Sequence, residues 1–150
     1  MTESFRQVLG RKVVSRATAH QLGTVGQLLT TVDCRRMAVV IIGRGKKAQL
    51  VDWAQLSGLG SDAVMVSDES ALRSPIDDRE QKAADGKLAL IGRRTLSELG
   101  NELGTVEDIM FDPATGVVET LTVAARPIPA EAVLGAGSYA VVVAASQDPA

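Results

Sequence analysis

The sequence is poor in aromatic side chains and in the residues that serve acid–base and metal chemistry. Aromatic residues make up 3% of the 150 residues although 45% are hydrophobic, so the core has to be built from Val, Leu, Ile and Ala. There is one histidine, His20, and one cysteine, Cys34. A single cysteine excludes an internal disulfide, and these two residues cannot supply a His/Cys metal core with the usual ligand spacing.

Long apolar runs are also absent. The longest stretch of low polarity, Ala132 to Ala145, is interrupted by glycines and is too short to span a bilayer. Residues Met1 to Val8 lack the charged start and apolar segment of a secretory signal. We therefore expect a cytoplasmic protein without membrane insertion.

What the sequence does contain is an internal repeat. Leu103-Gly104-Thr105-Val106 repeats Leu22-Gly23-Thr24-Val25 at an offset of 81 (103 − 22). Further matches precede and follow this motif in both copies, including Gly10-Arg11 and Gly92-Arg93. Self-similarity at a fixed spacing is typical of a duplicated structural unit. The sequence divides into an N-terminal tail (1–8), a first copy (9–66), a charged connector (67–87), a second copy (88–146) and a C-terminal tail (147–150).

The second copy contains a strong hairpin signal. Its apolar residues Val106, Ile109 and Phe111 are spaced by three and then two, which predicts a β-bulge that bends the strand. The segment from Asp112 to Gly116 (DPATG) predicts a type I turn with a bulge. Bent strands in a short chain favour a small closed barrel. We therefore expect a mainly β fold of two pseudo-symmetric small antiparallel β-barrels.

Three local features complete the expected fold. The first-copy turn has Arg35 at the glycine position, so it is either strained or differently shaped. Residues 126–129 (RPIP) predict a loop or an edge strand, because proline donates no ladder hydrogen bond. In the connector, Ser74 and Pro75 predict a short helix from Pro75 to Ala84. Its apolar face, Ile76 and Ala83, is thin, which predicts a position on the surface.

Together these motifs resemble the PRC-barrel family. The second copy combines a GxR start, an LGTVxDIxxDxxTGxVxxLxV hairpin, an Ile-Pro segment and a final GxxxYAVVV strand. The family includes the cytoplasmic part of the photosynthetic reaction-centre H subunit and the C-terminal domain of a ribosome maturation factor. The resemblance spans almost the whole chain as two tandem copies, closer in the second than in the first. It implies a small β-barrel that docks on other macromolecules and carries no catalytic residues.

Signals of chemistry are weak. His20 has no evident base or orienting partner, and its simplest interpretation is a solvent-facing loop residue. Cys34 beside Arg35 and Arg36 is either a reactive thiol of lowered pKa or an ordinary thiol at a hairpin tip, and the second is simpler. We therefore expect no catalytic residues, metal or cofactor, and a non-enzymatic interaction or assembly module that docks on a protein partner or self-associates.

The charge distribution supports an alternative function. Residues 1–75 carry ten Lys/Arg and six Asp/Glu (net +4), whereas residues 76–150 carry six and twelve (net −6). The alternative is an RNA- or ribosome-associated assembly factor, although no aromatic residues interleave with the basic ones as in single-stranded RNA readers. Its candidate basic patch lies in the first copy and comprises Arg11, Lys12, Arg35, Arg36, Arg44, Lys46 and Lys47.

Comparison of the copies predicts one unusual apolar face. The outward side of strand 118–123 is polar, whereas the equivalent residues of the first copy are Ala38, Val39 and Ile41. Burying Val or Ile is worth about 1.5–3 kcal/mol per side chain, so this face should be covered. Either the other barrel or the connector covers it within the chain, or it is the candidate interface of a homodimer.

Overall fold

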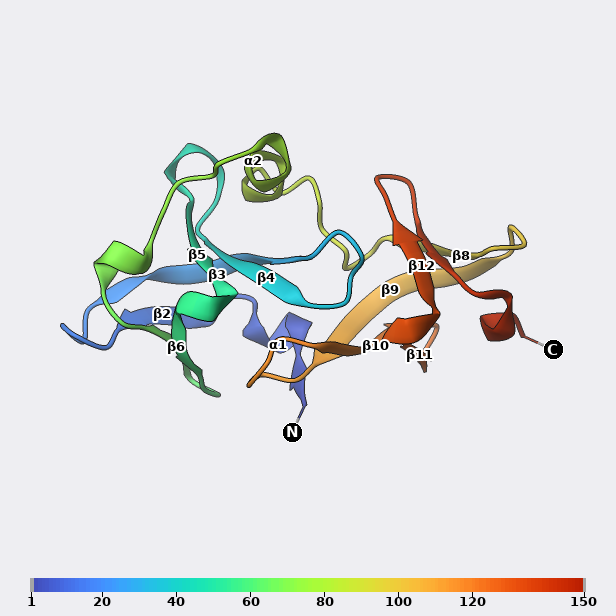
Figure 1. Ribbon diagram of the computed structural model, residues 1–150, viewed down its shortest axis with the longest axis horizontal. Coiled ribbons are helices and arrows are strands. Elements are labelled where there is room, and N and C mark those ends of the chain that lie inside the picture. The colour runs from blue at the N-terminus through green and yellow to red at the C-terminus, as the bar shows by residue number, and fades with distance from the viewer. Residues whose placement is uncertain (1, 150) are drawn as a thin grey trace. The chain divides into compact units, whose positions relative to one another are not determined.

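The computed structural model describes residues 2–149 and contains two β-sheets with the same strand order (Figure 1). The first-copy strands are β2 (Lys12–Ser15), β3 (Gln21–Thr30), β4 (Met37–Ile42), β5 (Gln49–Asp52), β6 (Leu56–Leu59) and β7 (Ala63–Val66). The second-copy strands are β8 (Arg94–Ser97), β9 (Glu102–Phe111), β10 (Val118–Val123), β11 (Arg126–Pro129), β12 (Val133–Ala136) and β13 (Val141–Val143). The orders are β5-β4-β3-β2-β7-β6 and β11-β10-β9-β8-β13-β12. The predicted mainly β fold with two matching copies is confirmed.

Helices are few and short. The α-helices are α1 (Phe5–Val8) and α2 (Asp78–Ala84), and a two-residue strand, β1 (Glu3–Ser4), precedes α1. Short 3-10 turns occupy Gly45–Lys47, Trp53–Gln55, Glu69–Ala71, Ala130–Ala132 and Ala145–Gln147. Among residues 2–149, no helix is long and apolar enough to cross a membrane.

Each sheet contains one parallel strand pair in addition to the expected antiparallel ones. The last strand of each copy lies beside the first, so β7 pairs with β2 and β13 pairs with β8, both in parallel. This pairing arises because the last strand returns from a hairpin and reaches the open side of the first strand. At the opposite edge of its sheet, β11 pairs among residues 2–149 with β10 alone, which confirms the proline-rich segment as an edge strand.

The two hairpin turns differ as the sequence indicates. The β9–β10 ladder has a register shift between Val106 and Asp108, which confirms the predicted bulge, and β9 is long and bent in Figure 1. Gly116 has a φ of 78° and donates its N–H to the carbonyl oxygen of Asp112 at 2.7 Å. In the first copy the positive φ falls on Cys34 (60°) instead of Arg35. That turn is therefore differently shaped.

The Gly-Arg pairs of the repeat make equivalent hydrogen bonds. Arg11 Nη1 donates to the carbonyl oxygen of Gly60 at 2.7 Å, and Arg93 Nη1 donates to that of Gly137 at 2.6 Å. Each arginine thereby ties the start of its copy to the turn between the last two strands. The repeated Gly-Arg pair therefore has the same structural role in both copies.

The repeated Leu-Gly-Thr-Val motif marks a close approach of two strands. Gly23 and Gly104 have φ values of 149° and 139°, which side chains rarely adopt. A Cβ atom at Gly23 would lie 2.5 Å from Cγ2 of Ile42, and one at Gly104 would lie 3.3 Å from Cγ1 of Val123. Both positions therefore require glycine, and the contact is tighter in the first copy.

We expect Gly23→Ala to destabilise the protein by about 2–4 kcal/mol and Gly104→Ala by about 1–2 kcal/mol, because both add backbone strain and the first also adds a clash. Thermal unfolding followed by circular dichroism measures both. Gly58→Ala is the control, because a Cβ atom there meets nothing within 4 Å. A larger loss for Gly104→Ala than for Gly23→Ala would contradict this account.

The chain divides into two compact units that do not coincide with the sequence copies. Unit 1 comprises Met1–Arg6, Thr30–Met37 and Ala89–Ala150, and unit 2 comprises Gln7–Leu29 and Ala38–Leu88. Unit 1 thus includes Thr30–Met37 of the first copy, and unit 2 includes the connector. The predicted N-terminal tail is wrong, since β1 pairs with β9 and Phe5 and Val8 are buried. The burial of the apolar side chains of Phe5 and Val8 explains why this segment packs onto the fold.

The connector helix also differs from its prediction. It begins at Asp78, three residues later than expected, because Oδ1 of Asp77 caps it by accepting the N–H of Glu80 at 2.8 Å. Its end at Ala84, before Gly86, is as predicted. Ala83 and Ala84 are both 1% exposed, whereas Ile76 lies outside the helix and is 76% exposed. The helix therefore lies at the surface, with Asp78, Gln81 and Lys82 exposed, but its other face is buried more fully than expected.

Candidate functional site

The apolar face of β4 is covered by α2. Val39 and Ile41 are 4% and 0% exposed and belong to a core cluster of unit 2. The other members of this cluster are Leu29, Ala48, Leu50, Ala83 and Ala84, with Ala38 and Leu88 packed at its margin. Of the two possibilities left open by the sequence, the connector accounts for the burial, and the candidate interface of Ala38, Val39 and Ile41 is not an open surface. Homodimer formation stays a prediction.

The equivalent face of β10 is polar and is not buried, since Glu119 is exposed and Thr120 and Thr122 are partly exposed. Oγ1 of Thr2 donates to Oε1 of Glu119 at 2.8 Å, and the hydroxyl of Ser4 donates to Oδ2 of Asp108. The two copies therefore differ in how far this face is buried.

Arg73 fixes the connector to unit 2. Its backbone N–H and carbonyl bond to Leu50 at 2.8 and 2.7 Å, so the residue extends the β5 edge. Its guanidinium donates to Oδ1 of Asp52 at 2.7 Å and to both carboxylate oxygens of Glu80 at 2.7 and 2.8 Å. These hydrogen bonds raise the pKa of Arg73 and lower that of Glu80. The sequence analysis missed this network, since no periodic signal links residues so far apart in the chain.

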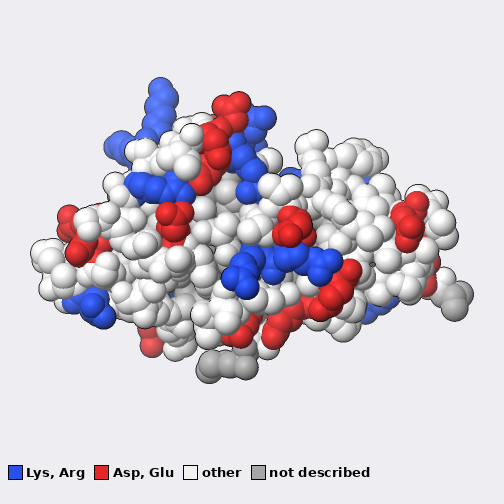
Figure 2. Space-filling model, in the orientation of Figure 1, with Lys and Arg blue, Asp and Glu red and all other residues white. Residues whose placement is uncertain are grey.

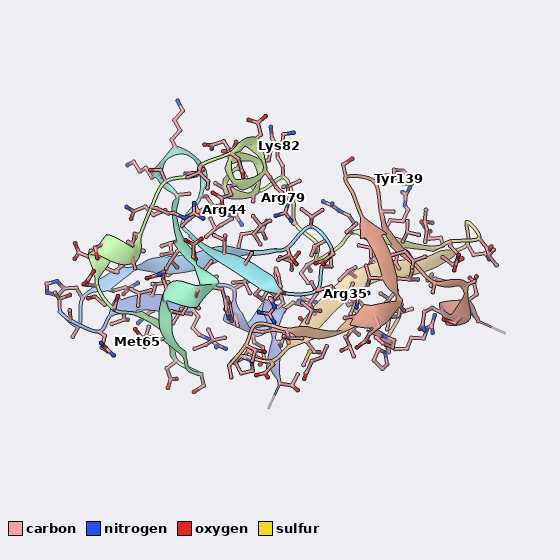
Figure 3. All side chains as sticks on the ribbon, in the orientation of Figure 1. Arg35, Arg44, Met65, Arg79, Lys82 and Tyr139 are labelled. Carbon is pink, nitrogen blue, oxygen red and sulfur yellow. The ribbon has the colours of Figure 1, made fainter. Side chains whose placement is uncertain are left out.

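The candidate basic patch does not form one surface within either unit. Arg35 and Arg36 belong to unit 1, whereas Arg11, Lys12, Arg44, Lys46 and Lys47 belong to unit 2. Arg11 bonds to Gly60, as described above, and Arg35 Nη2 donates to the carbonyl oxygen of Glu131 at 3.2 Å. Arg44, Arg79 and Lys82, which Figure 3 labels, belong to unit 2. Figure 2 shows acidic side chains interleaved with basic ones around α2. What remains is a small exposed cluster of Arg44, Lys46 and Lys47.

The two residues considered for chemistry, His20 and Cys34, lie in different environments. His20 is exposed, as the sequence predicts, whereas Cys34 is 3% exposed and accepts a long contact from the hydroxyl of Thr30 at 3.9 Å. Within residues 2–149, no three His, Cys, Asp or Glu side chains gather as metal ligands.

Most of the exposed large apolar side chains of the described residues lie in unit 1. Among the described residues these are Val32, Ile76, Leu99, Val117, Leu134 and Tyr139, and all except Ile76 belong to that unit. Val32 and Leu134 are 69% and 58% exposed and line a shallow groove of about 500 Å³. The groove is completed by Thr31, Asp33, Gly135 and Ala136, all in unit 1. In Figure 2 the surface over β12 is largely uncharged.

Hydrogen bonds within unit 1 hold one wall of the groove in place. The β3–β4 turn pairs with the β9–β10 turn, because Met37 N–H donates to the Gly116 carbonyl at 2.7 Å and Val118 N–H to that of Arg35 at 2.9 Å. The bond from Arg35 to Glu131 reaches the 3-10 turn that precedes β12. This wall is therefore fixed before any ligand binds.

The second wall depends on a bulge in an edge strand. Within the described chain β12 pairs with β13 alone, and the register shifts between Val133 and Gly135. Bulges at sheet edges redirect side chains, which explains why Leu134 points outward. The groove is not predicted from the sequence, although one signal is present there: Leu134 is equivalent to Ser57 in the first copy (134 − 57 = 77).

The charged residue that lines the groove, Asp33, is acidic, and the cation of Arg35 lies near it. Oδ1 of Asp33 accepts the hydroxyl of Thr31 at 2.6 Å and the N–H of Arg35 at 3.1 Å, and these bonds lower the pKa of Asp33. Asp33 is therefore ionised at neutral pH. Unit 1 contains six Lys/Arg and ten Asp/Glu, a net charge of −4.

A segment of unit 1 is similar to a known domain family. Residues 89–133 match the PRC-barrel domain. The PRC-barrel match spans β8 to β11 and ends one residue before Leu134, at the margin of the groove. The first copy lies outside the match, and no curated protein matches the chain.

Proposed function

We propose that this chain is a non-enzymatic interaction module that docks on a protein partner through the groove between Val32 and Leu134. The observation that carries the proposal is that two exposed large apolar side chains of unit 1, Val32 and Leu134, line one preformed groove. Contiguous exposed apolar surface on a soluble domain commonly marks a binding site. The resemblance to the PRC-barrel family implies docking on other macromolecules. The PRC-barrel match therefore supports the same function.

We further infer that the first copy is a second, diverged PRC-barrel. Its strand order matches that of the second copy strand for strand, and Arg11 and Arg93 make equivalent hydrogen bonds. The proposal thus assigns the duplicated fold to the scaffold and the docking role to unit 1.

Affinity capture from the native host tests the docking role. We expect a partner to be retained by the wild-type chain, and its affinity to fall at least about tenfold in Val32→Thr/Leu134→Ser, because both apolar contacts are lost. Leu99→Ser is the matched control, since Leu99 is 70% exposed in the same unit but lies outside the groove. Equal retention by the double variant and the wild type would refute the proposal.

The alternative is RNA binding by the cluster of Arg44, Lys46 and Lys47. These side chains are exposed on and beside a single turn of unit 2, and phosphate contacts from them would weaken steeply with salt. The same capture experiment distinguishes the two functions. Retained RNA that is lost on replacing all three residues with Ala would favour the alternative.

A further inference from the structure

The groove has one apolar pair and one charge. Val32 and Leu134 provide its apolar side chains from the β3–β4 turn and from β12, respectively. Asp33 is the single charged residue among those that line it. An apolar side chain seated between Val32 and Leu134 would therefore lie near a carboxylate.

The floor of the groove has room for such a side chain. It is formed by Gly135 and Ala136, which contribute little side-chain volume. A Cβ atom added at Gly135 would meet no heavy atom within 4 Å, so the space above it is open. The φ of Gly135 is outside the positive range, so other residues fit its backbone conformation.

The carboxylate of the groove favours a cationic group beside that apolar side chain. Within residues 2–149 the hydrogen bonds of Asp33 are accepted by Oδ1, from Thr31 and Arg35, so Oδ2 can accept a further donor even though the Arg35 cation lies nearby. Glu131, three residues before Leu134, is also exposed, and unit 1 as a whole has a net charge of −4. A cationic group next to the apolar anchor complements both features.

We propose that the groove binds a partner segment in which a large apolar side chain stands next to a lysine or arginine. The apolar side chain lies between Val32 and Leu134, and the cation pairs with Asp33. The inference rests on the proposed docking function and adds the chemistry of the partner.

A second copy of this chain is a poorer occupant. Its exposed basic cluster, residues 44–47, contains no large apolar residue, and exposed Ile76 is followed by two aspartates. Tyr139 is exposed and lies 4.5 Å from the guanidinium carbon of Arg94, measured to the ring centroid. That cation is already paired with Glu102 at 2.9 Å. The partner is therefore a different protein.

Selection from a random ten-residue peptide library displayed on phage tests this chemistry. The bait is the full chain, and Gly135→Val fills the groove without touching another residue through its Cβ atom. Gly58→Val is the matched control, because Gly58 is the equivalent residue of β6 and is equally open. Thermal unfolding verifies that each variant is folded, and Leu134→Ser replaces Gly135→Val if the latter is not.

We expect enriched peptides to carry Leu, Ile, Met or Phe beside Lys or Arg. They should bind wild type and Gly58→Val alike and bind Gly135→Val at least about tenfold more weakly. Asp33→Asn keeps the Oδ1 acceptor of the turn but removes the negative charge. The variant should therefore still select peptides with a large apolar residue, but should no longer select Lys or Arg beside it. Peptides without a basic preference, or peptides that bind Gly135→Val as well as wild type, would overturn the inference.

Two outcomes separate this inference from the proposed function. If Val32→Thr/Leu134→Ser abolishes partner capture but the peptides show no basic preference, the docking function stands and the inference fails. If the peptides behave as expected but capture is unaffected by the double variant, the proposed function fails. A wild-type dimer in light scattering that Gly135→Val dissociates would identify a second copy as the occupant and overturn the inference.

Discussion

Replacing Val39 and Ile41 with threonine is expected to destabilise unit 2 by about 3–5 kcal/mol without changing the mass of the protein. Both side chains are buried against Ala83 and Ala84 of α2, so the substitutions remove methyl groups from the core and place hydroxyls there. Urea unfolding followed by the fluorescence of Trp53 measures the loss, because the single tryptophan lies in unit 2. Light scattering measures the mass.

The second copy provides the reciprocal control. Thr120 and Thr122 are the residues equivalent to Val39 and Ile41, and both are partly exposed. Thr120→Val/Thr122→Ile should therefore change stability by no more than about 1 kcal/mol. Loss of a dimer in Val39→Thr/Ile41→Thr with unchanged unfolding would show that the face is a subunit interface instead.

Replacing Arg73 with alanine is expected to cost about 2–3 kcal/mol. The Arg73 and Glu80 side chains are 25% and 10% exposed, so the substitution leaves a largely buried carboxylate without its cation. Asp52 is 49% exposed and recovers hydration, so most of the loss should involve Glu80. Urea unfolding of Arg73→Ala, Glu80→Ala and the double variant should give a coupling energy above about 1 kcal/mol. Lys46→Ala, an exposed cation in the same unit, should be neutral.

The pH dependence of Glu80→Gln tests the same network. Arg73 lowers the pKa of Glu80 below its ordinary value of 4.5 in the folded protein. The ionised carboxylate therefore stabilises the fold above pH 4.5, and this contribution is lost as the pH falls through the lowered folded pKa. The stability difference between wild type and Glu80→Gln should be largest near neutral pH and shrink in acid. A difference that grows in acid would contradict the assigned role of Arg73.

The sequence by itself determined the elements that depend on local chemistry. The repeated Leu-Gly-Thr-Val motif identified the duplication, since Gly23 and Gly104 share a backbone conformation that requires glycine. The spacing of Val106, Ile109 and Phe111 identified the bulge, and the prolines of β11 identified an edge strand. Each of these features is set by residues that are near one another in the chain.

The tertiary structure decided which segment covers which surface. The sequence showed that Val39 and Ile41 needed a cover, but the choice of α2 depends on the Arg73 network and on two alanines, whose small side chains carry no strong signal. The groove between Val32 and Leu134 likewise joins residues about 100 positions apart, through backbone hydrogen bonds between two turns and a bulge in β12. Pairings between distant segments are set by the free energy of the whole fold, which no local pattern encodes.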